Sequence, residues 1–395
     1  MAESLLIKQG EIYDAVQDSP YMADILIENG KIVKIAPVIE GKAVNEARIL
    51  DVSGWRVYPG FVDAHCHLGM DGHGGGFENQ DFNELNDPVT PNLSAVDGIN
   101  PLDRTFQLVR EAGVTCVASG PGSSNVVGGT FCVLKTVGNR VDDMVIKPKA
   151  AMKIAFGENP KTCYQKKEIT SRMSIAAKLR EVLEKTLEYD KRRESDPEHT
   201  PYDAKLEAML PVVRGEMPLK AHVHRADDMF TAIRIAREFH LGLTMDHCTD
   251  GALIAGELAK EGYSLAVGPS FGHATKRELV NKSFHTPGVL ANAGCKVSII
   301  TDSPVVEGRY LTLCAGLAIR EGMTEQQALR AITINSAEHI GAGDRVGSIE
   351  EGKDADFVVT LGSPFGADPG IVYTIIDGNI VYENHKHSDA KGKVQ

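Results

Sequence analysis

The sequence lacks the features that mark several large classes of protein. Its seven cysteines are odd in number and widely spaced, and no Cys-x-x-Cys pair occurs, which argues against a disulfide framework and against a zinc–thiolate site. No apolar run approaches the length of a bilayer span, and the N-terminus lacks the basic segment and apolar core of a secretion signal. We therefore expect no membrane association and a cytoplasmic location.

Positive charge is also scarce. The 42 lysines and arginines are outnumbered by 54 aspartates and glutamates, which gives a formal net charge of −12. An acidic surface repels phosphate backbones, so nucleic acid is not an expected partner. The 395 residues, 42% of them hydrophobic, predict a soluble protein with room for a large barrel and a second domain.

Histidines are placed where a metal would need them. The run 57–67 is rich in β-branched and aromatic residues and ends in His65-Cys66-His67. Residues i and i+2 of a strand point to the same face, so both imidazoles can aim at one point beyond the strand end. Two converging imidazoles suit a divalent metal, although a surface strand can also carry His-x-His.

Three later apolar runs also end in ligand-type residues. Run 219–224 ends in a second His-x-His, run 241–247 ends in a histidine, and run 296–302 ends in an aspartate. A single such residue is as readily a buried core histidine or a helix-capping aspartate, but four strand ends of this kind are not. Imidazole and carboxylate without thiolate predict a divalent metal, zinc first, with iron or manganese as alternatives. The strand-end candidates are His65, His67, His222, His247 and Asp302.

The middle of the chain alternates strands and helices. We expect helices over 102–112, 227–239, 251–261 and 286–293, and strands over 114–118 and 264–267. This alternation, with ligands only at strand C-termini, predicts a parallel (β/α)₈ TIM-type barrel over residues 59–345. The alternative, a doubly wound sheet, would have a phosphate-binding glycine turn at its first strand. A charged helical insertion interrupts the pattern at about residues 163–216.

Both chain ends are rich in strands and turns. Asn29-Gly30 is a strong hairpin signal, and similar strand-and-turn patterns follow residue 346. We expect residues 1–58 and 346–395 to form one small β-sandwich domain beside the barrel.

A glycine-rich stretch, 120–129, follows one of the expected barrel strands. It has the composition of a phosphate cradle but lacks the Gly-Lys-Ser/Thr end of a nucleotide-binding loop. We expect it to shape the pocket instead, with Asn125 as a candidate substrate contact.

The segment Pro59-Gly-Phe-Val-Asp-Ala-His-Cys-His67 resembles the first-strand signature of the metal-dependent amidohydrolase superfamily. The closing stretches 331–338 and 345–356 resemble it as well. Segments 87–91, 120–123, 157–161 and 222–228 are similar to the imidazolonepropionase-related branch. The resemblance covers nearly the whole chain.

The resemblance implies a ligand set. His65 and His67 match the first-strand ligands, His222 the fifth, His247 the sixth and Asp302 the eighth. It also implies a fourth-strand residue that bridges two metals, for which two candidates stay open. Lys153, carboxylated on its amine, is favoured because a long side chain can start deep in the barrel, and Glu158 would bind directly. If neither binds, the site holds one metal.

The implied activity is hydrolysis of a C–N bond in a small molecule such as a cyclic amide, a dipeptide or an N-acyl amino acid. Asp302 would accept a proton from metal-activated water, and His247 would help to polarise the scissile carbon. His224 and Arg225 are candidate substrate contacts, and a homo-oligomer is expected. One alternative is deamination of a heterocycle. Another is a non-catalytic scaffold, and the intact ligand positions disfavour that scaffold.

Overall fold

The computed structural model describes residues 4–41 and 47–388. Residues 1–3, 42–46 and 389–395 of the expected terminal domain lie outside the described residues. The strands form two eight-stranded sheets, which we call the terminal sheet and the barrel sheet.

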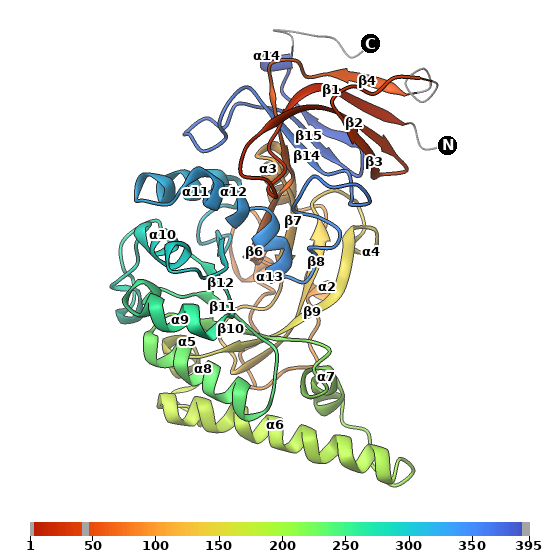
Figure 1. Cartoon of the computed structure of the whole chain (residues 1–395). Helices are drawn as coiled ribbons and strands as arrows, with labels where there is room; N and C mark the ends of the chain where they lie inside the picture. Colours follow the sequence, from red (N-terminus) through yellow and green to blue (C-terminus); the bar gives the residue numbers. More distant parts are fainter. Residues whose placement is uncertain (1–3, 42–46, 389–395) are drawn as a thin grey trace.

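The terminal sheet joins the two ends of the chain, drawn in red and dark blue in Figure 1. Its order is β16-β15-β14-β5-β1-β2-β3, and β4 pairs with β1. Asn29 and Gly30 turn between β2 and β3 with φ of 52° and 75°, as the hairpin signal predicts. All eight strands belong to one hydrogen-bonded sheet, so the sandwich arrangement stays a prediction. The strands are β1 (Leu5–Ile12), β2 (Tyr21–Glu28), β3 (Lys31–Ala36), β4 (Arg48–Asp51), β5 (Arg56–Pro59), β14 (Phe357–Thr360), β15 (Ile371–Ile376) and β16 (Asn379–Glu383).

The barrel sheet runs in the order β13-β12-β11-β10-β9-β8-β7-β6. Its two edges meet just beyond the strands, where Asp302 N donates to His65 O (3.1 Å) and His67 N donates to Ser303 O (2.8 Å), so the barrel is nearly closed. The strands are β6 (Phe61–Cys66), β7 (Val114–Ser119), β8 (Val127–Lys135), β9 (Val145–Ala155), β10 (Leu219–Val223), β11 (Leu243–His247), β12 (Ser264–Val267) and β13 (Val297–Ile299).

The expectation of a uniformly parallel (β/α)₈ barrel was wrong at one strand. β8 runs antiparallel to both β7 and β9. The connection 120–126 between β7 and β8 is too short for a crossover, which needs a dozen or more residues, so the chain has to return antiparallel. The glycine-rich stretch therefore turns a hairpin at the barrel mouth.

Helices cover the outside of the barrel. In the range of the expected insertion, α6 and α7 pack side by side at the end of the molecule away from the terminal sheet (Figure 1). In the described part of the chain no helix has the length and apolarity of a membrane span. The longer helices are α3 (Arg104–Glu111), α5 (Glu158–Tyr164), α6 (Arg172–Ser195), α7 (Ala204–Val213), α8 (Ala226–Glu238), α9 (Ala255–Glu261), α10 (His285–Asn292), α11 (Leu311–Arg320), α12 (Glu325–Ala331) and α13 (Ile334–His339). The short ones are α2 (Ala95–Gly98), α4 (Val141–Met144), α14 (His385–Ser388), η1 (Phe77–Asn79), η2 (Gly251–Ile254), η3 (Arg277–Leu279) and η4 (Gly308–Tyr310).

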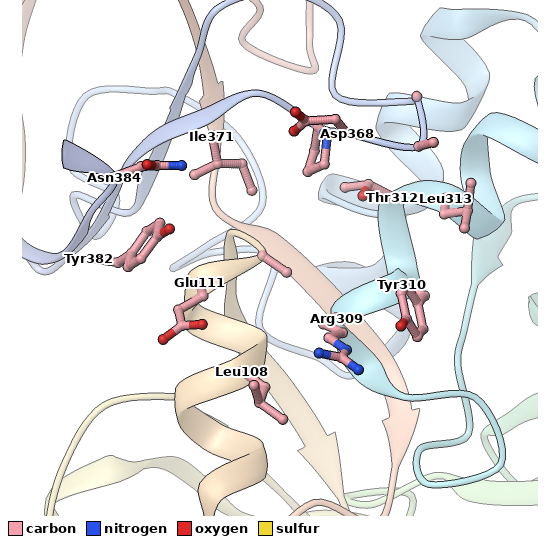
Figure 2. A pocket seen from close by; sticks show the side chains of 14 residues that line it. Leu108, Glu111, Arg309, Tyr310, Thr312, Leu313, Asp368, Ile371, Tyr382 and Asn384 are labelled. Atoms are coloured by element: carbon pink, nitrogen blue, oxygen red, sulfur yellow. The ribbon is translucent and has the colours of Figure 1, made fainter. Parts of the chain in front are cut away.

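A cavity of about 290 Å³ lies where the barrel meets the terminal sheet. Figure 2 shows its lining, which includes Leu108 and Glu111 of α3, Arg309 of η4 and Tyr382 of β16. Arg309 forms an ion pair with Glu307 at 2.7 Å. The cavity lining includes no histidine, so it is separate from the predicted metal ligands.

A buried lysine also holds the two sheets together. Lys135 ends β8, and its Nζ lies 2.6 Å from Asp356, 3.1 Å from Asp354 and 3.1 Å from Asp377. Burial disfavours the ammonium, but the carboxylates of Asp356, Asp377 and Asp354 outweigh it and raise the pKa of Lys135.

Replacing this lysine tests the junction. Lys135→Met keeps the length of the side chain but leaves the buried carboxylate of Asp356 without its cation, so we expect the free energy of unfolding to fall by about 3–5 kcal/mol. Urea denaturation measures the change. Lys185→Met is the control, because Lys185 is 60% exposed and its helix pair contributes only about 0.3–0.5 kcal/mol. Equal unfolding midpoints for the two variants would contradict the role of Lys135.

Candidate metal centre

The barrel mouth brings the predicted first-strand and eighth-strand ligands together. His65 lies on β6, His67 directly follows that strand, and Asp302 follows β13. Oδ1 of Asp302 lies 3.3 Å from Nε2 of His65 and 3.2 Å from Nε2 of His67. Both histidines are buried, and the Asp302 side chain is 15% exposed. We call these three residues the first cluster.

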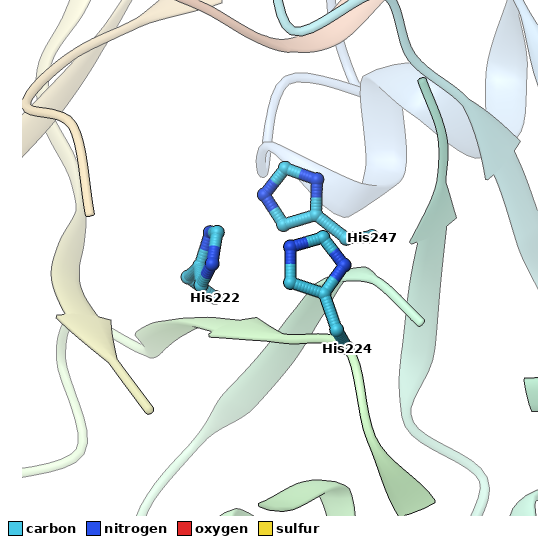
Figure 3. Close-up of side chains that lie close together, drawn as sticks. All are labelled: His222, His224 and His247. Atoms are coloured by element: carbon cyan, nitrogen blue, oxygen red, sulfur yellow. The ribbon is translucent and has the colours of Figure 1, made fainter. Parts of the chain in front are cut away.

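A second cluster consists of His222, His224 and His247, whose rings converge in Figure 3. Their ring centroids are 4.4 Å apart for His222 and His247, and 4.7 Å apart for the other two pairs. His224, which the sequence suggested as a substrate contact, therefore belongs to a potential ligand group. The rings of His65 and His247 are 5.1 Å apart, so the two clusters adjoin.

Hydrogen bonds fix how several of these rings present their nitrogens. Nδ1 of His67 donates to Gly120 O at 2.7 Å, and Nδ1 of His247 donates to Gly268 O at 2.8 Å. Because a carbonyl oxygen only accepts, Nδ1 carries a proton in both rings, and Nε2 is the nitrogen left to face a metal. An Nδ1 partner of this kind is the usual support for a metal-binding histidine.

Two of the ring nitrogens are buried without a partner. Nε2 of His222 and Nε2 of His247 have no hydrogen-bond partner among residues 4–41 and 47–388. Burial lowers the pKa of His247 to about 3 and holds the pKa of His222 well below its usual range, so both rings are neutral. A buried hydrogen-bond acceptor without a partner is energetically costly. A divalent ion bound to Nε2 would remove this cost, because neutral imidazoles are common ligands of such ions. The residues present therefore fit a divalent metal.

Asp302 is an ionised carboxylate in this setting. Burial alone would raise its pKa, but His247, His65 and His67 outweigh burial and hold the pKa of Asp302 well below its usual range. This carboxylate and the neighbouring imidazoles form a donor set typical of zinc, manganese or iron.

The two candidates for the bridging position lie in different surroundings. Lys153, fully buried on β9, places Nζ 3.4 Å from Nε2 of His65, and burial lowers its pKa to about 8. Glu158 begins α5, and its carboxylate accepts a hydrogen bond from Glu278 N at 3.0 Å. The structure thus brings Lys153 to the first cluster, whereas Glu158 is engaged with the backbone of another loop.

The predicted substrate contacts Asn125 and Arg225 are already engaged. The amide of Asn125 donates to Thr90 at 2.7 Å and accepts from the Tyr164 hydroxyl at 2.6 Å. Arg225 makes two hydrogen bonds to Asp227, at 2.9 and 2.7 Å. Both side chains are thus hydrogen-bonded within the protein, and their role as substrate contacts stays a prediction.

Other supporting residues were not found in the sequence. Asp246 lies within β11, fully buried, with Oδ2 3.0 Å from Nδ1 of His65. The backbone carbonyl of Gly120 accepts the hydrogen bond from His67, and it could not be identified from the sequence because every residue has such a carbonyl. Its glycine is nonetheless required, because a Cβ there would lie 2.3 Å from the Phe131 ring.

Comparisons with known proteins agree with this geometry. A sequence profile described as "Amidohydrolase family" matches residues 56–381. A solved amidohydrolase structure from Thermotoga maritima MSB8 is 38% identical, with a TM-score of 0.92 over 96% of this chain and 100% of that one.

Curated relatives are more distant in sequence. "Amidohydrolase tasK" from Hapsidospora irregularis is 27% identical over 92% of this chain, which spans only 40% of that protein. An imidazolonepropionase from Thermoplasma volcanium is 24% identical over 85% of this chain and 83% of its own length.

Removing one ligand tests whether the clusters bind metal. Loss of a residue that only supports a metal ligand typically weakens metal binding by ~10–100-fold. His67 is a proposed ligand itself, so we expect His67→Ala to weaken divalent metal binding by at least that much. Metal content after dialysis against limiting Zn²⁺, measured by mass spectrometry, gives the result. His199→Ala is the control, since the His199 side chain is 80% exposed. Equal zinc content in the two variants would contradict the site.

Proposed function

Because the chain belongs to the amidohydrolase family, we propose that it is a metal-dependent hydrolase that cleaves a C–N bond of a small molecule. The observation that carries this proposal is the ionised, largely buried Asp302 in contact with two histidines, beside the unpartnered Nε2 atoms of His222 and His247. An ionised carboxylate next to ring nitrogens that could bind a metal is the arrangement that hydrolysis by activated water requires.

The first cluster would hold one divalent ion and the second cluster would hold another. Zinc is the favoured ion for this donor set, with iron or manganese as alternatives. When bound, such an ion supplies Lewis acidity and lowers the pKa of its water from about 15.7 to about 7.

Within this site Asp302 moves the proton. Its carboxylate would accept a proton from the attacking water and return it to the leaving nitrogen. The His67 ring is held by Gly120 O, which keeps Nε2 directed at Asp302. His247 has its proton on Nδ1, so its Nε2 cannot donate to a substrate carbonyl, and the geometry favours a ligand role for it.

We also propose Lys153 as the bridging residue. Addition of CO₂ to its neutral amine would form an N–C bond and release one proton, which gives a carbamate with two oxygens. Burial favours the neutral amine that this step needs. The charge of Lys153 acts on His222 and His247 as well as His65, so the side chain lies near both clusters.

Asp302→Asn tests the reaction. Asparagine has nearly the same shape but cannot take the proton, so turnover should fall by ~10²–10⁴-fold while the fold is kept. The assay follows whichever cyclic amide, dipeptide or N-acyl amino acid the wild type hydrolyses, with metal content measured alongside. More than about a tenth of wild-type turnover would contradict the role of Asp302. Ammonia release from an intact heterocycle would instead identify a deaminase.

Lys153→Ala tests the bridging residue. We expect bound metal and turnover to fall together, by at least the ~10–100-fold cost of a lost supporting partner. Added acetate or propionate should restore part of both by supplying the missing carboxylate. Glu158→Ala is the matched control and should keep wild-type metal content. The opposite pattern, with loss in Glu158→Ala alone, would assign the bridging position to Glu158.

A further inference from the structure

Beneath the first cluster lies a buried polar network that the proposed reaction does not use. Its centre is Asp246, which is fully buried on β11 directly before His247. One carboxylate oxygen, Oδ2, lies 3.0 Å from Nδ1 of His65. The other, Oδ1, accepts a hydrogen bond from Lys220 Nζ at 2.8 Å.

Two further residues anchor this carboxylate from the far side. Lys220 on β10 also donates to Ala64 O on β6 at 3.0 Å. Nε2 of His339, at the end of α13, lies 3.2 Å from Oδ1 of Asp246 and 3.2 Å from Lys220 Nζ. Nδ1 of His339 is 2.9 Å from the Ser264 hydroxyl. The network therefore connects strands β10, β11 and β12 and helix α13 to His65 on β6.

The contact between His65 and Asp246 is the nearest polar contact of both atoms, since Lys153 Nζ lies farther from Oδ2 of Asp246, at 3.8 Å. Nδ1 of His65 and Oδ2 of Asp246 are buried, and neither has a hydrogen-bond partner elsewhere in the described ranges. They face each other at ion-pair distance. Burial alone would raise the pKa of Asp246, but Lys220 and His65 outweigh it and hold that pKa well below its usual range.

Stability does not account for this arrangement. Replacing a buried ion pair by well-packed apolar side chains is often neutral or stabilising, because desolvation offsets the attraction. The ion pair of Lys220 and Asp246 places a carboxylate at Nδ1 of His65, which an apolar pair would not do.

This carboxylate also distinguishes His65 from three other histidines of the site, His67, His224 and His247. The Nδ1 atoms of His67 and His247 meet backbone carbonyls, and that of His224 meets the Thr249 hydroxyl at 2.8 Å. A carboxylate partner makes an imidazole a more basic metal ligand than a neutral partner does.

We propose that Asp246, anchored by Lys220 and His339, is a positioning residue that holds His65 with Nε2 directed at the first cluster and so strengthens metal binding there selectively. This inference rests on the proposed metal site. Asp246 acts through His65, which lies 3.0 Å from its Oδ2, whereas Lys153 Nζ lies 3.8 Å away, beyond hydrogen-bond distance.

The test is a zinc titration of the metal-free full-length protein against a chromophoric chelator, with Co²⁺ absorption as a second readout. We expect Asp246→Asn to weaken one of two bound ions by ~10–100-fold and to leave the other unchanged. The cobalt spectrum should lose the contribution of the weakened site at limiting cobalt. Thermal unfolding of the metal-free protein shows whether the fold is kept.

Two further variants make the result specific. Asp246→Asn combined with Lys220→Met removes both buried charges, so no unpaired charge is left to destabilise the fold. This double variant should show the same loss of zinc affinity at one of the two sites. Thr249→Val removes the Nδ1 partner of His224 and should affect only the other ion.

The outcomes separate the two proposals. Unchanged zinc affinity in Asp246→Asn, or equal weakening of both ions, would overturn the positioning role while leaving the metal site intact. A wild-type chain that binds no divalent ion would overturn the proposed function and this inference with it.

Discussion

The cost of burying imidazole and carboxylate groups governs the architecture of the barrel mouth. His65, His67, His222, His224 and His247 are all buried, and Asp302 is nearly so. Such groups are stable in a protein interior only if their polar atoms have partners. The Nδ1 partners of His67, His224 and His247 follow the ends of neighbouring strands, whereas the Nδ1 partner of His65 is Asp246 within β11. The geometry of the site is therefore a consequence of how the barrel closes.

Closing the barrel also places strain at the same residues. His247 has φ of 73° and Asp302 has φ of 52°, in the left-handed region that non-glycine residues seldom adopt. Each such residue costs on the order of 1–3 kcal/mol and persists only where the surroundings over-determine it. The hydrogen bonds from Asp302 N to His65 O and from His247 Nδ1 to Gly268 O supply that constraint. The strained positions coincide with the ligand-type residues, which is common at functional sites.

The sequence allowed the ligand-type residues to be predicted because each ends a β-branched or apolar run. Helix and strand positions in the barrel were also close, as in α8, expected over 227–239 and observed at Ala226–Glu238. The direction of β8 was missed because alternation says nothing about orientation, although the short connection before it does. Asp246 was missed because it reads as one residue of an apolar strand run. A charged residue inside such a run, next to a candidate ligand, is the signal that would have found it.

The two clusters differ in charge, and this difference bears on Lys153. The first cluster has the carboxylate of Asp302, whereas the second consists of neutral imidazoles alone. Lys153 carries a positive charge when protonated, and the carboxylates of Asp246 and Asp302 oppose it there. A divalent ion at either cluster would add positive charge next to that ammonium, and in a buried site such repulsion is strong. Binding of two ions is therefore consistent only with a neutral or carboxylated Lys153. Conversion to an anion would both remove the repulsion and supply the carboxylate that the second cluster lacks.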